Sequence, residues 1–233
     1  MRKLLVLIAV TACAGDPAES MVDGGIGPDG GVAPDAPPGD PTAAQLLAAI
    51  AACQVIGGPY AADVGDTATI DVCGTDLAVY WTADMDIDCD GQMSAQCNTT
   101  TDPSYQNQTA AVDSMGDPLD AATLPFVVLP TPSVRFDYRS HAIGMRTVVA
   151  VIYQDQVVYG VAGDTGPTSI IGEASYAMAE ALGIDPDPSV GGTDGPVAYI
   201  AFTGMESRVD VIEDQAAATT LGIARAKALL GQP

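Results

Sequence analysis

Residues 157–182, VVYGVAGDTGPTSIIGEASYAMAEAL, constrain the fold more than any other part of the sequence. They predict a strand that runs into a Gly-rich loop and then into a helix, which ends at Gly183, a residue suited to a left-handed C-cap. Two carboxylates mark this junction, Asp164 after the last strand residues and Glu173 where the helix begins. Because a flexible loop separates them, the two can face each other across a bound ligand. The sequence therefore predicts a cleft at this junction.

Short strands outnumber helices over the domain. Strand-like runs lie at 67–72, 77–81, 124–129, 147–153, 157–161 and 197–203, and helical patterns at 43–53, 173–182 and 213–230. Thr42 is a suitable N-cap for the first helix, and Gln154 and Asp155 favour a hairpin turn. Because strand and helix do not alternate regularly, we predict an α+β domain. The simplest arrangement is a β-rich small barrel of six strands with flanking helices, for which a double-psi-like topology is one candidate.

The chain begins with a secretory pattern. Residues 1–13, MRKLLVLIAVTAC, combine a basic start, an apolar run too short to span a membrane, and small residues before a cysteine. Their end resembles the lipobox of bacterial lipoproteins, which predicts lipidation at Cys13; an ordinary signal peptide with a coincidental cysteine is the alternative. Residues 14–42 are rich in Gly, Pro and Asp, which predicts a disordered linker. Residues 43–233 then form one domain.

The charge balance is strongly acidic, with 30 Asp and Glu against 8 Lys and Arg and a formal net charge of -22. We expect no nucleic-acid partner, because phosphate binding requires clustered Lys and Arg. A cationic partner would be attracted instead. The alternative is that the acidity only keeps a secreted protein soluble.

Four of the five cysteines lie in the predicted domain, an even number that suits two disulfides in an oxidising compartment. Three pairings are open, and we expect the nearest neighbours to pair, Cys53 with Cys73 and Cys89 with Cys97. A zinc site is not favoured, because no Cys-x-x-Cys motif occurs and the single histidine, His141, is distant in sequence.

Four aspartates alternate along residues 84–90, DMDIDCD. In a strand they would line one face, where like charges repel and require a metal ion, a basic side chain or a cationic substrate. The run DIDCDG from Asp86 also matches the start of an EF-hand loop, but the twelfth position is Cys97 instead of a glutamate. Calcium binding, a solvated acidic turn and substrate contact all stay open, and we assign no metal ligand.

The carboxylate pair has a plain alternative explanation. Asp164 could form an Asx-turn, and Glu173 could favour a helix N-terminus through the helix dipole. His141 has no recognisable triad companions, so we expect a structural role or a substrate contact. Motifs for a serine nucleophile or for a phosphate-binding loop are absent.

Several segments, in order, resemble the fungal-type chitosanases of glycoside hydrolase family 75, which has bacterial members. They are MDIDCDG at 85–91, QTA at 108–110, LPFVV at 124–128, SH at 140–141, YGVAGDT at 159–165, GEAS at 172–175 and VAYIAF at 197–202. One such motif would be suggestive, whereas so many in the same order are specific.

The resemblance implies a bacterial endo-chitosanase that hydrolyses β-1,4 bonds between glucosamine units with inversion, using two carboxylates and no cofactor. Carried over by motif, the catalytic residues are Asp164 and Glu173, with the acid and base roles open. The residues expected to contact the cationic substrate are Asp84, Asp86, Asp88, Asp90, Gln108, His141 and Thr165. A tryptophan common before Gly-Asp-Thr in the family is Ala162 here, which predicts a smaller stacking surface for sugar.

We therefore predict a monomeric chitosanase, secreted or held as a lipoprotein at a bacterial outer membrane or in the periplasm, and bound to membrane only through Cys13. One alternative is a hydrolase of another amino-sugar or cell-wall glycan. Another is a surface module that binds polysaccharide or calcium through a degenerate site.

Overall fold

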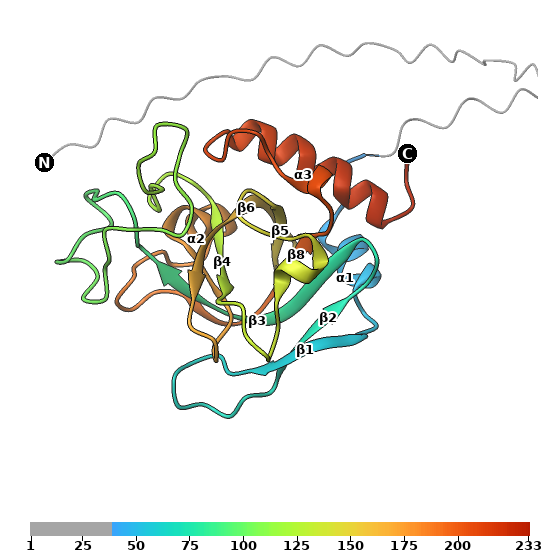
Figure 1. Cartoon of the computed structure of the whole chain (residues 1–233), viewed down its shortest axis with the longest axis horizontal. Helices are drawn as coiled ribbons and strands as arrows, with labels where there is room; N and C mark the ends of the chain where they lie inside the picture. The colour runs from blue at the N-terminus through green and yellow to red at the C-terminus, as the bar shows by residue number, and fades with distance from the viewer. Residues whose placement is uncertain (1–38) are drawn as a thin grey trace, which may run out of the picture. The chain divides into compact units, whose positions relative to one another are not determined.

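A computed structural model describes residues 39–233 (Figure 1). Most of its strands are formed by the apolar runs of the sequence. The predicted signal peptide, Cys13 and nearly all of the predicted linker lie outside the described residues. The strands are β1 (Val55–Tyr60), β2 (Ile70–Gly74), β3 (Ala78–Asp88), β4 (Phe126–Pro130), β5 (Val148–Tyr153), β6 (Gln156–Gly166), β7 (Glu173–Ser175) and β8 (Thr193–Phe202). The helices are α1 (Ala43–Ala49), α2 (Tyr176–Leu182) and α3 (Gln215–Leu229), with 3-10 turns at Tyr138–His141 and Met205–Ser207. Among the described residues, no helix is long and apolar enough to cross a membrane.

Six strands close into a ring, in the order β3-β7-β4-β6-β5-β8, because β8 also pairs with β3. The pairs β3–β7 and β4–β6 are parallel, whereas the other contacts of the ring are antiparallel. β1 and β2 extend the sheet beyond β3. The prediction of a small α+β barrel with flanking helices is therefore confirmed.

Side chains alternate along the ring strands and sort into two apolar sets. On β5, Val149 and Val151 belong to the set inside the ring, together with Trp81 and Tyr199, whose stacked rings lie 5.3 Å apart. Ala150 lies on the opposite face, with the residues that α1 and α3 cover. Because both faces are buried, β5 is apolar throughout, as the sequence shows.

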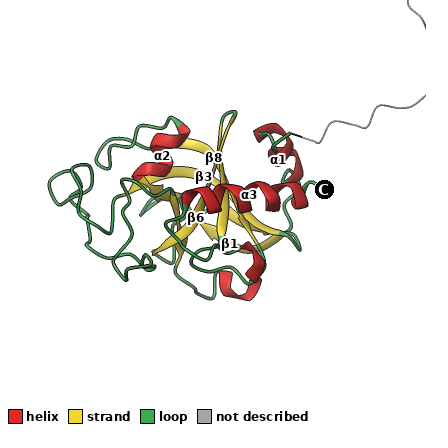
Figure 2. Cartoon of the chain, turned by 90° about the horizontal axis from the view of Figure 1, so that it is seen from above, coloured by secondary structure: helices red, strands yellow, loops and turns green. Residues whose placement is uncertain are grey.

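α3 lies across one side of the barrel (Figures 1 and 2), and small residues allow it to approach closely. Ala218, Gly222 and Ala226 recur every fourth residue and are its buried residues. A Cβ on Gly222 would overlap the ring of Tyr159 on β6. The predicted final helix is present, and its contact with the barrel depends on close approach instead of large apolar side chains.

The segment after β6 differs from the prediction. β6 continues through Asp164, and Glu173 begins strand β7 instead of a helix. α2 begins only after Ser175, whose hydroxyl accepts a hydrogen bond from the Met178 amide at 3.2 Å. The prediction that Glu173 begins the helix is wrong, because pairing with β3 and β4 holds the residues before α2 in a strand.

Both predicted disulfides are present. Cys53–Cys73 ties the segment after α1 to β2, and Cys89–Cys97 closes the start of the long connection between β3 and β4. This connection lies at the left of Figures 1 and 2. The hydroxyl of Tyr105 donates to the Gly91 carbonyl at 2.7 Å, which folds the connection back toward the end of β3.

Candidate active site

Strand register brings the two predicted catalytic carboxylates to one face of the barrel. Asp164 on β6 pairs with Val128 on β4, and Glu173 on β7 pairs with Asp86 on β3. β4 and β7 pair at Val127 and Ala174, which adjoin Val128 and Glu173 in the sequence. Because neighbouring side chains point to opposite faces, Val128 and Glu173 share a face. Asp164, Glu173 and Asp86 therefore stand on the same face of four adjacent strands.

Asp164 is held by backbone donors. Its Oδ1 accepts a hydrogen bond from the Ala110 amide at 2.7 Å and from the Thr165 amide at 2.6 Å. The Ala111 amide donates to the Gly163 carbonyl at 3.0 Å, so the long connection crosses β6 at this point. Hydrogen bonds to the charged form favour ionisation. Burial acts in the other direction and is the larger effect, so the pKa of Asp164 is raised.

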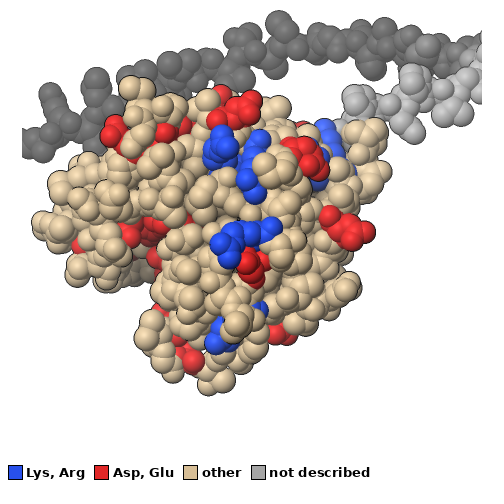
Figure 3. Space-filling model, viewed as in Figure 1, with Lys and Arg blue, Asp and Glu red and all other residues tan. Residues whose placement is uncertain are grey.

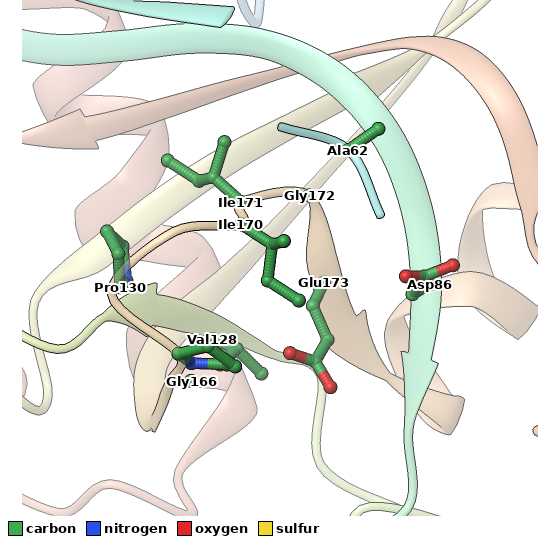
Figure 4. Close-up of a pocket in the computed structure, with 10 residues that line it drawn as sticks. Ala62, Asp86, Val128, Pro130, Gly166, Ile170, Ile171, Gly172 and Glu173 are labelled. Carbon is green, nitrogen blue, oxygen red and sulfur yellow. The ribbon is translucent and has the colours of Figure 1, made fainter. Parts of the chain in front are cut away.

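Glu173 lies at a small pocket between the strand ends (Figure 4). Its carboxylate lies beside Gly166 and Val128, and Asp86 stands on the neighbouring strand. Over residues 39–233, no hydrogen bond of the protein reaches the Glu173 carboxylate. The pocket is lined by Ala62, Asp86, Val128, Pro130, Gly166, Pro167, Ile170, Ile171, Gly172 and Glu173. A carboxyl group with apolar neighbours and no donor favours its neutral form.

Asp88 and Asp90 complete the group of carboxylates. The Asp88 side chain is only 5% exposed, and its Oδ1 accepts a hydrogen bond from the Asp90 amide at 2.6 Å. Asp90 in turn accepts from the Gln106 amide at 2.6 Å. Carboxylate oxygens of Asp88, Asp90 and Asp164 lie within 4.8 Å of one another. The end of β3 therefore meets the end of β6 through acidic side chains.

Burial and mutual repulsion raise the pKa of several of these groups. Burial, with the charges of Asp86, Asp90, Asp164 and a further aspartate, raises the pKa of Glu173 to about 7. Burial first and neighbouring carboxylates second raise the pKa of Asp84 and of Asp90 to about 6. Burial and the charge of Glu173 raise the pKa of Asp88 well above its usual range. The site is suited to holding a proton near neutral pH.

Basic side chains do not relieve this repulsion. In the described part of the chain, the ion pairs are Arg139–Asp137, Arg225–Glu206 and Lys227–Asp40, none of which includes a carboxylate of the site. Arg146 and Arg208 donate to backbone carbonyls elsewhere. In Figure 3, basic side chains lie in the centre and right of the face shown, with acidic ones between them. Of the three predicted ways to relieve the repulsion, a basic side chain is therefore not used among residues 39–233, and a metal ion or a cationic substrate is left.

The raised pKa values predict a pH dependence of stability. A carboxyl whose pKa is higher in the folded state stabilises the fold below its unfolded pKa, and this stabilisation is lost as the pH rises through the folded pKa. We therefore expect the free energy of unfolding to decrease from pH 5 to pH 8. Glu173 should account for about 2 kcal/mol of this decrease once solvent screening is allowed for.

Thermal unfolding at several pH values checks this expectation. Glu173→Gln should flatten the pH dependence, whereas Glu180→Gln, at an exposed position on α2, should leave it unchanged. Stability that increases from pH 5 to pH 8 in the unmodified protein would contradict it.

The other predicted substrate contacts are spread more widely. Thr165 adjoins Asp164 and is partly exposed, and Gln108 is exposed in the connection two residues before Ala110. His141 is not beside the carboxylates: its ring stacks on Phe136 with centroids 5.6 Å apart. It lines a different pocket, with Gln54, Ile56, Gly74, Thr75 and Asp76. A substrate contact at His141 would therefore be separate from the carboxylate pair.

The four alternating aspartates are not equivalent. Asp86 is exposed and Asp84 is partly buried, with its Oδ1 near Gly172 and lacking a hydrogen-bond partner among residues 39–233. Asp88 is buried, and Asp90 is fixed by the connection that follows. The sequence predicted that all four line one face, whereas in the structure only Asp86 is exposed, Asp84 and Asp90 are partly buried and Asp88 is buried.

Two further acidic residues act on the site and were not predicted from the sequence. Asp102 is 7% exposed, accepts a hydrogen bond from the Ser104 amide at 2.7 Å, and its charge raises the pKa of Glu173 and Asp90. Asp63, after β1, acts in the same way on Asp84. Local sequence carries no signal for these contacts, because loops bring the residues to the site.

An EF-hand loop is not formed at residues 86–97. Asp86 and Asp88 belong to strand β3, and Cys97 at the twelfth position is in a disulfide and cannot supply a carboxylate. The approach of Asp88, Asp90 and Asp164 does not by itself identify a metal site, since acidic side chains often approach closely without an ion. We assign no metal ligand.

Comparison with known proteins gives the family. A family described as fungal chitosanase of glycosyl hydrolase group 75 matches residues 85–226, which include the end of β3, all of β4 to β8 and most of α3. The chain belongs to this family. The matched segment contains both Asp164 and Glu173. It also contains three of the four alternating aspartates, Asp86, Asp88 and Asp90.

Several group 75 relatives are fungal proteins. An endo-chitosanase of Aspergillus oryzae is 38% identical over 136 residues, 54% of this chain and 56% of the relative. Endo-chitosanase B of the same species is 36% identical over 131 residues, 53% and 55% of the two chains. An endo-chitosanase of Aspergillus fumigatus is 35% identical over 133 residues, again 53% and 55%. The chain thus spans about half the length of the curated relatives it matches.

The position of Ala162 can now be reinterpreted within this family. Ala162 is fully buried, and it pairs with Val127 on the inner face of the ring. A tryptophan side chain at this position would point into the barrel. The expectation that Ala162 reduces a sugar-stacking surface is therefore wrong. Ala162 and Asp164 are two positions apart but face opposite sides of β6, because a register shift in the pairing of β4 with β6 interrupts the alternation between them.

Proposed function

We propose that the chain is an endo-chitosanase that hydrolyses β-1,4 bonds between glucosamine units with inversion, and that residues 43–233 are its catalytic domain. The observation that carries this proposal is the meeting of Asp164 and Glu173, from two separate family motifs, on one face of adjacent strands. Relatives named endo-chitosanases support the reaction class. An inverting enzyme needs two carboxyl groups roughly 6.5–9.5 Å apart, with space between them for the sugar and a water molecule.

The surroundings favour Glu173 as the acid and Asp164 as the base. Among residues 39–233 no group donates a hydrogen bond to the Glu173 side chain, and its pKa is raised to about 7, so it holds a proton near neutral pH. Asp164 accepts two backbone hydrogen bonds, which favour its ionised form. In the reaction, Glu173 gives its proton to the glycosidic oxygen as the bond to the anomeric carbon breaks. Water attacks that carbon from the opposite face and loses a proton to Asp164.

Unrelieved negative charge supports a cationic substrate. Carboxylates at the site repel one another, and no basic side chain of residues 39–233 forms an ion pair with them. Ammonium groups of glucosamine would lower this repulsion on binding. We propose that Asp84 and Asp86 contact the substrate amines most directly, with Thr165 and Gln108 along the same face. No cofactor is proposed.

We also propose that the protein is exported from a bacterial cell as a monomer and is attached to membrane only by lipid on Cys13. Two disulfides support export to an oxidising compartment. The lipobox-like end of residues 1–13 supports a bacterial lipoprotein, in the periplasm or at the outer membrane. Mass spectrometry of the mature protein tests lipidation, and an unmodified N-terminus after cleavage elsewhere contradicts it.

Digestion of chitosan with NMR analysis of the anomers tests the activity. We expect oligosaccharides of glucosamine whose new reducing ends first appear as the α-anomer, because the β-linkage is inverted. The digestion is repeated with a calcium chelator, which should not change the rate. Cleavage only of acetylated chitin or peptidoglycan would change the substrate, binding without products would contradict an enzyme, and initial β-anomers would contradict inversion.

A further inference from the structure

Asp88 is a buried carboxyl group to which the two-carboxylate mechanism gives no role. Its side chain is 5% exposed, less than that of Asp164 at 8%. A residue so enclosed is poorly placed to contact the substrate in the way that the exposed Asp86 is. Asp88 nevertheless lies among the reacting groups, since its oxygens are within 4.8 Å of those of Asp164 and Asp90.

The parallel pairing of β3 and β7 also sets Asp88 beside Glu173. Asp86 pairs with Glu173, and Asp88 pairs with Ser175, two residues further along each strand. Asp88 and Glu173 are therefore diagonal neighbours on the same face of two adjacent strands. The only hydrogen bond that the Asp88 side chain accepts in the described structure comes from the Asp90 amide. Within the described part of the chain, neither carboxyl group forms an ion pair with a basic side chain.

Two such carboxyl groups cannot both be ionised at low cost. Like charges in a site with little water raise the affinity for one proton, which the pair then holds jointly. The groups that face the pair add to this effect because they are also acidic. They are Asp86 from β3, Asp90 and Asp102 from the connection after β3, and Asp164 from β6, while Tyr199 from β8 donates its hydroxyl proton to the backbone carbonyl of Asp84.

We propose that Asp88 and Glu173 form a carboxyl pair that shares one proton, and that Asp88 is a positioning residue that keeps Glu173 protonated near neutral pH. Asp88 does not touch the substrate in this proposal; it acts through Glu173. The proton sharing is a property of the fold alone, whereas its catalytic meaning rests on the proposed function. The raised pKa of both groups is consistent with the pair.

Carbon-13 NMR of glutamate carboxyl groups tests the pair without any substrate. The chain has five glutamates, and the Glu173 signal is identified by its loss in Glu173→Gln. In the unmodified protein we expect Glu173 to titrate in two steps. In Asp88→Asn we expect a single step, shifted to lower pH by about 1 unit or more, because the neighbouring charge is gone. Asp155→Asn, which removes one charge from the exposed turn before β6, is the matched control and should titrate as the unmodified protein.

A kinetic measurement then tests the catalytic meaning. The alkaline limb of kcat/KM for hydrolysis of a glucosamine oligosaccharide should shift to lower pH in Asp88→Asn by the same amount as the Glu173 signal. The titration of the substrate amines is common to all variants and does not affect the comparison. A merely structural role for Asp88 would lower the rate at every pH without this shift.

The outcomes separate the two proposals. An unchanged Glu173 titration in Asp88→Asn overturns the pair. A shifted titration in a protein that does not cleave chitosan leaves the shared proton standing and overturns the proposed function, and with it the catalytic role of Asp88. If Asp88→Asn does not fold, the unmodified protein decides: a single step near 4.5, the ordinary value for glutamate, overturns the pair.

Discussion

Glu173→Gln and Asp164→Asn should each reduce the rate of chitosan hydrolysis by about a thousandfold or more, with the fold unchanged. Glutamine cannot protonate the glycosidic oxygen, and asparagine cannot take a proton from the attacking water. Both replacements preserve shape, and neither leaves a buried charge unpaired. The release of reducing ends from chitosan measures the rate, and thermal unfolding measures the fold.

Two exposed acidic residues provide matched controls for this prediction. Glu180→Gln on α2 and Asp155→Asn in the turn before β6 make the same chemical changes away from the site. Both controls should retain the activity of the unmodified protein. Substantial hydrolysis by either Glu173→Gln or Asp164→Asn would remove that residue from the mechanism, and loss of activity in the controls would show that net charge alone matters.

Gly91→Ala should lower the free energy of unfolding by about 3 kcal/mol and greatly reduce activity. Gly91 has a φ of 114°, which side chains rarely adopt, and a Cβ there would overlap the Leu119 carbonyl oxygen. The Gly91 amide also donates to the Gln106 carbonyl, and the Gly91 carbonyl accepts from the Tyr105 hydroxyl; these two bonds anchor the connection over the site. Displacing this glycine would therefore move the neighbouring Asp90.

Gly116→Ala separates the two causes of this loss. Gly116 has a φ of 88°, but no atom lies within 4 Å of a Cβ placed there. This variant carries the backbone strain without the overlap, so we expect it to cost about 1 kcal/mol. Chemical denaturation of both variants checks the difference. Equal losses in the two would show that strain alone determines the effect at Gly91.

Part of the candidate site could be predicted from sequence because motif residues carry it. Asp164 and Glu173 were identified, and the structure places them on one face. Their local geometry was not predicted, since Glu173 stands in a strand and the helix begins three residues later. The helix dipole therefore has no bearing on the acid or base role of Glu173. That role follows from burial and from neighbouring charges on other strands.

Strand β1 illustrates why some elements could not be predicted. Its sequence, VIGGPY, contains glycines and a proline that argue against a strand. The structure shows the reason for one glycine, since a Cβ on Gly57 would lie 2.8 Å from the Phe136 side chain. Phe136, which is distant in the sequence, thus determines which residue β1 can carry at position 57. No local pattern reports such a contact.

Sequence by itself determined the features that depend on near neighbours. They include the Thr42 cap, the hairpin between β5 and β6 and the C-cap at Gly183. The sequence left three disulfide pairings open, and the structure shows the pairing of nearest neighbours. Only the tertiary structure decided the parallel pairing of β3 with β7, the burial of Asp88 and the approach of Asp102. The physical reason is that caps and turns are made by residues a few positions apart, whereas the charge environment of Glu173 depends on strands and loops that meet only when the barrel closes.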